Sequence, residues 1–182
     1  MDYETELRRR ARYVAGRAVA ETRTGLPYVR VSILPGEPAL EAPAALLQWA
    51  SPREAENLLV RLHAGLAALL LLEPAHEASA YQLAAEDLRR AAGVREQLQA
   101  LKPERAVDDD AWLQRAQLLV SEPCNVEAIN AIASELQLRG SLAMEEVDFL
   151  VEHADGDPDA VDALQRYRQL FAPEPVPWPD HT

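Results

Sequence analysis

The apolar run from Leu58 to Leu72 is the feature that most constrains the fold of this chain. It follows Ser51-Pro52-Arg53-Glu54, a pattern typical of a helix start, with a hydroxyl cap, proline in the first turn and Glu three residues after the cap. Arg61 and His63 interrupt the run, which falls short of the about 20 apolar residues that a membrane span requires. We therefore expect a buried core helix from Pro52 to about Leu72, and no membrane partner.

A second long helix is expected over about Tyr3 to Thr22. Small and apolar residues recur there at intervals of three and four residues, which places them on one helical face: Leu7, Ala11, Val14, Ala15, Ala18 and Val19. Gly16 lies inside this helix, where glycine costs about 1 kcal/mol relative to alanine. Its presence predicts that another element packs closely against it.

Residues 28–34 alternate in polarity and predict a short, half-buried strand. Val29, Val31 and Ile33 fall on one face of this strand, and Arg30 and Ser32 on the other. The loop over residues 35–43 is rich in proline and has space for a second short strand.

Caps and periodicity predict further helices over about Glu77–Leu101, Asp109–Ser121, Pro123–Arg139, Ala143–His153 and Pro158–Phe171. Gly140 fits a helix C-terminus, and Ser141 fits the N-cap of the helix that follows. The expected fold is mostly α, with six or seven helices and a small β-sheet at about residues 28–42. A chain of 182 residues favours one domain, over residues 1–171. The proline-rich tail, residues 172–182, is expected either to pack as an extended arm or to be disordered.

Composition and charge argue against several function classes. The net charge of −12 opposes general binding to a phosphate backbone. Four arginines in the first helix, Arg8, Arg9, Arg10 and Arg12, are expected to form a solvated face paired with acidic surface rather than a nucleic-acid patch, because no aromatic series accompanies them. The single cysteine, and a start that does not resemble a signal peptide, lead us to expect a cytoplasmic protein.

No motif in the sequence predicts a cofactor or an active site. None of the four histidines lies three or four residues from another, and His76-Glu77 is not completed by a second histidine. Cys124 and the serines lack the context of a catalytic nucleophile, and no phosphate-binding loop occurs. We therefore expect neither a metal nor a cofactor.

Three stretches, in their order and spacing, resemble the peptidase domain of the FtsH-like AAA+ zinc metalloproteases. The first is the helix RYVAGRAVAE with the turn and strand that follow it, the second joins AGLAA at residues 64–68 to AAEDLRRA at 84–91, and the third is residues 116–151. In that family an H-E-x-x-H helix holds zinc through two histidines, and an Asp of the second stretch is the third ligand. The resemblance implies a stand-alone domain that lacks the family's ATPase module.

The resemblance places the zinc ligands on Tyr13, Arg17 and Asp87, and the catalytic Glu on Val14. A phenol, a guanidinium and an aliphatic group cannot perform the chemistry of these positions, so the zinc site is expected to be lost. If Asp87 still lies opposite Tyr13 and Arg17, the guanidinium pairs with its carboxylate where zinc would lie. The alternative is that Arg17 points to solvent and Asp87 faces a helix terminus.

The function implied by this resemblance is that of a catalytically inactive peptidase-like domain that acts as a scaffold or regulator. It would bind polypeptide along an edge strand made of Tyr28, Val29, Arg30, Val31, Ser32 and Ile33, or self-associate, since the family forms rings. One alternative is an active zinc metallopeptidase whose ligands lie elsewhere. Another is a nucleic-acid accessory protein that uses the first-helix arginines.

Overall fold

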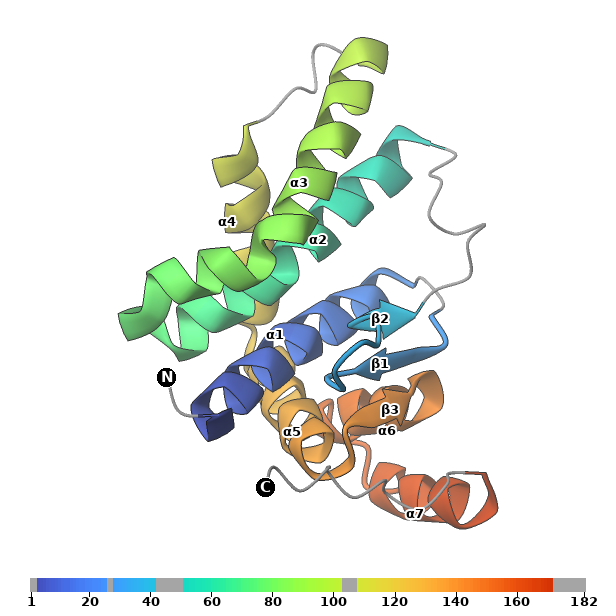
Figure 1. Ribbon diagram of the computed structural model, residues 1–182. Coiled ribbons are helices and arrows are strands. Elements are labelled where there is room, and N and C mark those ends of the chain that lie inside the picture. Colours follow the sequence, from blue (N-terminus) through green and yellow to red (C-terminus); the bar gives the residue numbers. More distant parts are fainter. Residues whose placement is uncertain (1–2, 26–27, 42–50, 103–107, 172–182) are drawn as a thin grey trace.

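The computed structural model describes residues 3–25, 28–41, 51–102 and 108–171, which form seven α-helices and a small sheet (Figure 1). The tail at residues 172–182, and the prediction made for it, lie outside the described residues. The helices are α1 (Tyr3–Thr24), α2 (Pro52–Leu72), α3 (Glu77–Leu101), α4 (Asp109–Val120), α5 (Pro123–Arg139), α6 (Met144–Ala154) and α7 (Ala160–Leu170), with a 3-10 turn, η2 (Pro74–His76). The strands are β1 (Arg30–Ser32), β2 (Leu40–Glu41) and β3 (Ser141–Ala143).

The predicted fold class, mostly α with a small sheet, is confirmed. Every predicted helix is present, with its ends within about two residues of the predicted ones. Local caps explain this agreement: the Ser51 hydroxyl accepts a hydrogen bond from the Glu54 amide at 3.3 Å, and Gly140 ends α5 with a φ of 78°.

Helix α1 lies at the centre of the molecule, between α2 on one side and α5 on the other (Figure 1). Its apolar face is buried from Ala11 onward, with Leu7 partly buried at its start, and it carries many residues of the main hydrophobic core, among them Ala11, Val14, Ala15, Ala18 and Val19. A smaller core joins α2 and α3 to Trp112 of α4. Because α1 is central, its side chains contact residues of several other helices.

Two glycines allow α1 and α2 to pack closely. A Cβ atom on Gly16 would lie 2.5 Å from the Ala68 Cβ and 2.9 Å from the Ala64 backbone oxygen. A Cβ atom on Gly65 would lie 2.6 Å from the ring of Tyr13. The close approach predicted at Gly16 is therefore present, and its partner is the small-residue stretch of α2.

The predicted edge strand is wrong, because β1 is the central strand of the sheet. The strand order is β2-β1-β3, and both neighbours run antiparallel to β1. Residues 141–143 close the second edge of β1, although Ser141 was expected to cap a helix. The cap of α6 is instead Ala143, whose amide donates to the Glu146 carboxylate at 3.0 Å.

The predicted alternation of β1 is also partly wrong. Val29 is 50 % exposed, whereas Tyr28 and Ser32 are buried. The Val29 amide donates to the Glu41 carbonyl at 2.7 Å, and Arg30 is also paired with Glu41. Two residues of one strand thus lie opposite one residue of the other, as in a β-bulge, which shifts the side-chain alternation by one position.

Helix α2 is the buried core helix that the sequence predicted, and its bounds match the predicted ones. Its 21 residues reach a mean hydropathy of 1.5 over an 18-residue window, so by length and composition it could cross a membrane. In the structure 61 % of that window is buried, and α2 packs against α1, α3 and α4. The two interrupting polar residues, Arg61 and His63, are each at most 2 % exposed, and the Nδ1 atom of His63 lies 2.7 Å from the Leu59 carbonyl oxygen.

Three arginines of the predicted cluster are paired with acidic groups, as predicted: Arg8, Arg9 and Arg12. Arg10 instead donates to the Leu34 carbonyl group, and the cluster is not solvated throughout. Arg9 is only 4 % exposed, and its Nε donates to the Glu73 carboxylate at 3.0 Å. Arg12 donates to the same carboxylate at 2.8 Å. Burial tends to raise the pKa of Glu73, but the hydrogen bonds and charges of Arg12 and Arg9 outweigh it and hold that pKa below its usual value. The ion pairs of Arg9 and Arg12 with Glu73 link the first half of α1 to the end of α2.

Candidate functional site

Polar side chains recur at intervals of four residues along one face of α1, and all of them are buried. Arg9, Tyr13, Arg17 and Glu21 are 4 %, 5 %, 9 % and 6 % exposed. Because a spacing of four residues keeps side chains on one helical face, these groups form a continuous polar line directed at α2 and α3. Buried polar and charged groups require partners. Each of these four side chains is hydrogen-bonded to a residue of α2 or α3, or to Glu73 at the end of α2.

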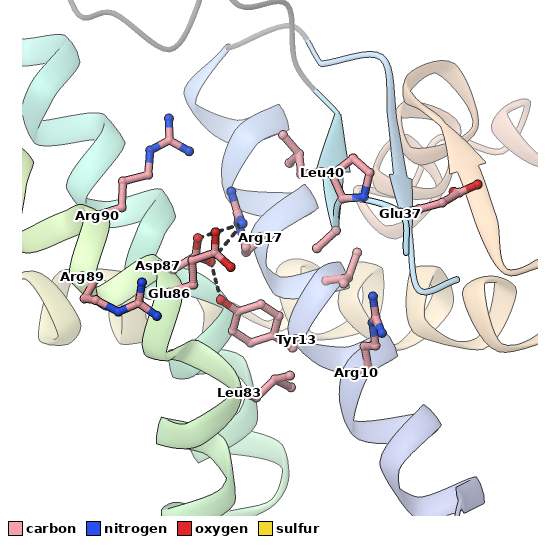
Figure 2. Close-up of a pocket in the computed structure, with 13 residues that line it drawn as sticks. Arg10, Tyr13, Arg17, Glu37, Leu40, Leu83, Glu86, Asp87, Arg89 and Arg90 are labelled. Carbon is pink, nitrogen blue, oxygen red and sulfur yellow. Dashed lines mark hydrogen bonds and ion pairs between the residues drawn. The ribbon is translucent and has the colours of Figure 1, made fainter. Parts of the chain in front are cut away.

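The centre of this line is a contact between Tyr13, Arg17 and Asp87 (Figure 2). Nη1 of Arg17 lies 3.0 Å from Oδ1 and 2.9 Å from Oδ2 of Asp87. The Tyr13 hydroxyl donates a short hydrogen bond to Oδ2 of the same carboxylate. The predicted meeting of these three residues is therefore present, and the alternative of a solvent-facing Arg17 is wrong.

The Tyr13 phenol stays protonated at this site. Burial raises its pKa well above the usual value for tyrosine, and the negative charge of Asp87 raises it further. The Arg17 charge acts in the opposite direction but is outweighed. Tyr13 is therefore a fixed hydrogen-bond donor to Asp87, and Asp87 accepts from both residues of α1.

A second buried ion pair lies one turn further along α1, and the sequence analysis missed it. Nη1 of Arg61 lies 3.1 Å from the Glu21 carboxylate, and Arg61 is 2 % exposed. Burial raises the pKa of the Glu21 carboxyl and lowers that of the Arg61 guanidinium, while the opposite charge of each partner counteracts the shift. Two features of the sequence could have indicated it. Glu21 follows Arg17 by four residues, and Arg61 is a lone arginine within the apolar run.

A pocket of about 670 Å³ opens above the Arg17–Asp87 pair (Figure 2). Helix α1 supplies one part of its wall, α3 a second, and the segment that leads into β2 a third. Its lining residues are Arg10, Tyr13, Val14 and Arg17 from α1, Leu83, Glu86, Asp87, Arg89 and Arg90 from α3, and Glu37, Pro38, Ala39 and Leu40. The lining includes none of residues 28–33, which were the predicted peptide-binding residues.

The residues of this pocket do not form a metal site. Of the three positions that converge, only Asp87 supplies a side chain that zinc favours. No group of three or more His, Cys, Asp or Glu side chains placed to hold a metal ion occurs in the described part of the chain. Val14, which the resemblance to the zinc metalloproteases aligns with a catalytic Glu, lines the pocket and is 1 % exposed. The convergent donors are instead arranged as a salt bridge with an added phenol.

No protein-family model and no curated protein matches this chain. Any statement of function therefore depends on the geometry of this site.

Proposed function

We propose that this chain is a catalytically inactive relative of zinc metallopeptidase domains and that it acts by binding polypeptide rather than cleaving it. The observation that carries the proposal is the convergence of Tyr13 and Arg17 on Asp87. Two positions four residues apart on one helix meet a carboxylate from a second helix, which is the geometry of a zinc site with two ligands from an H-E-x-x-H helix and a third from elsewhere. The guanidinium supplies the positive charge that the metal would supply.

The edge of β2 supports polypeptide binding in the pocket. The amides of β1 donate to the carbonyl groups of Ala39 and Glu41, so the backbone of Leu40, between them, faces away from the sheet. Leu40 also lines the pocket. An extended segment that adds to this edge would gain main-chain hydrogen bonds from Leu40 and lie above the Arg17–Asp87 pair.

The purified chain is expected to bind unfolded casein without cleaving it. Leu40→Pro removes the outward amide of β2 and keeps the hydrogen bonds that Val29 and Ser32 donate, because these use the carbonyl groups on either side of Leu40. We expect about tenfold weaker binding, the scale of one lost hydrogen bond. Leu40→Val is the matched control and keeps the amide. Fluorescence anisotropy of labelled casein measures binding, and gel electrophoresis detects cleavage. Zinc-dependent cleavage by the unaltered chain would refute the proposal.

Restoring the two histidines tests the relation to a zinc site. Tyr13→His with Arg17→His would place two imidazoles opposite Asp87, and we expect stoichiometric zinc binding. Glu96→His with Ala100→His gives the same spacing on the exposed surface of α3 and is the control. Competition against a zinc-sensitive dye measures the affinities. A folded variant that binds zinc no more tightly than the control would count against the proposed ancestry. The same holds if adding Asp87→Ala to the two-histidine variant leaves its zinc affinity unchanged.

A further inference from the structure

The pocket carries more positive than negative charge, although the whole chain has a net charge of −12. Four arginines line it, and Arg17 is neutralised by Asp87. Arg89 and Arg90 have no ion-pair partner in the described part of the chain, and Arg89 is exposed. A local excess of cations on an acidic protein is a feature that attracts anionic groups selectively.

The remaining charges of the pocket confirm this excess. Arg10 donates a hydrogen bond to the uncharged carbonyl group of Leu34 at 3.3 Å, so its charge is not cancelled. Two acidic residues of the described lining lie outside the Asp87 pair, Glu37 and Glu86. Glu37 lies 3.6 Å from Arg30, which is shared with Glu41 at 2.7 Å, so two carboxylates face three arginines, Arg10, Arg89 and Arg90. Figure 2 shows Arg89 and Arg90 on the α3 side of the pocket and Arg10 on the α1 side, so cations border it from two directions.

We infer that the pocket recognises an acidic segment of extended polypeptide, an inference that rests on the polypeptide binding proposed above. Every second side chain of a segment added to β2 would point to the same face. Asp or Glu at alternate positions would then approach Arg10, Arg89 and Arg90, and each guanidinium is suited to a carboxylate. A nucleic-acid strand fits less well, because Tyr13, the one aromatic side chain among the described residues of the lining, is buried and offers no stacking surface.

Three labelled peptides test the inference, with the full chain as the binding protein. In these peptides Thr alternates with Glu, with Gln or with Lys. We expect the Glu peptide to bind most tightly and its affinity to fall as salt is added, since exposed charges are screened. Arg89→Glu with Arg90→Glu should weaken binding of this peptide about tenfold or more and leave the Gln peptide nearly unaffected. Arg53→Glu with Arg166→Glu makes the same change in net charge at exposed positions outside the pocket and is the control.

The possible outcomes separate this inference from the proposed function. Equal binding of the Glu and Gln peptides would overturn the acidic preference and leave polypeptide binding intact. Failure of all three peptides to bind would overturn both. If a single-stranded oligonucleotide displaced the Glu peptide and bound more tightly, the ligand would be nucleic acid and the inference would be wrong. A melting curve for each variant shows that it is folded, and Arg89→Gln with Arg90→Gln replaces the charge reversal if that variant unfolds.

Discussion

Asp87→Ala is expected to lower the free energy of unfolding by about 3–5 kcal/mol. The substitution removes the carboxylate that accepts from both Arg17 and Tyr13, and it leaves a guanidinium that is only 9 % exposed without its counter-charge. Arg17 Nε already has no hydrogen-bond partner in the described residues, so the substitution would leave Nη1 of the same guanidinium without its partner as well. Chemical denaturation followed by circular dichroism measures the loss, which corresponds to a melting point lower by about 6–20 °C.

Two variants show whether this loss comes from an uncompensated buried charge. Glu86→Ala removes the adjacent, exposed carboxylate and is expected to change stability by less than about 0.5 kcal/mol. Arg17→Met combined with Asp87→Leu removes both charges, and it should recover most of the stability because apolar residues can replace a buried pair at little cost. A double variant as unstable as Asp87→Ala would contradict this explanation.

A chelator is expected to leave the melting curve of the unaltered chain unchanged. The positive charge at Asp87 comes from Arg17, which is part of the chain and is not removed by chelation. A lower melting point in the presence of chelator would show that a bound metal contributes to folding, and the proposed inactive site would then be wrong.

Gly16→Val is expected to destabilise the fold by about 3 kcal/mol. The new Cβ alone would lie 2.5 Å from the Ala68 Cβ and 2.9 Å from the Ala64 oxygen, and a backbone atom cannot move aside as a flexible side chain can. The helices must separate, and the contact of α1 with α2 is the centre of the core. Denaturant titration measures the effect.

Gly93→Val is the matched control for this prediction. Gly93 also lies inside a helix, α3, but a Cβ atom there would have no neighbour within 4 Å. Because valine has a higher helix propensity than glycine, we expect this variant to be as stable as the unaltered chain or slightly more stable. Equal destabilisation by both substitutions would mean that the close packing of α1 on α2 does not explain Gly16.

The helices and the presence of a small sheet near residues 28–42 could be predicted from the sequence, whereas the third strand and the order of the strands could not. Helix ends depend on local groups such as the Ser51 hydroxyl and the positive φ of Gly140, which act within a few residues. The partner of β1 at Ser141–Ala143 lies more than a hundred residues away, and its short segment resembles a helix cap when considered alone. A single bulge at Val29 then moved the buried face of the strand.

The candidate site was predictable in part, and for a similar reason. Tyr13 and Arg17 share a helical face by their spacing alone, and their meeting with Asp87 was expected from the resemblance to a zinc site. The pairing of Glu21 with Arg61 was not expected, since no local pattern indicates which buried carboxylate lies opposite a lone arginine of another helix.

The amino-acid sequence by itself thus determined the seven helices, most of their caps, the packing requirement at Gly16 and the absence of two histidines at the spacing of a zinc-binding helix. All of these depend on residue identity and on interactions within a few positions of the chain. Only the tertiary structure decided which strand is central, which strand of the described sheet lies at the edge beside the pocket, and which charges are paired. These properties depend on contacts between residues far apart in sequence, and such contacts exist only once the helices have packed around α1.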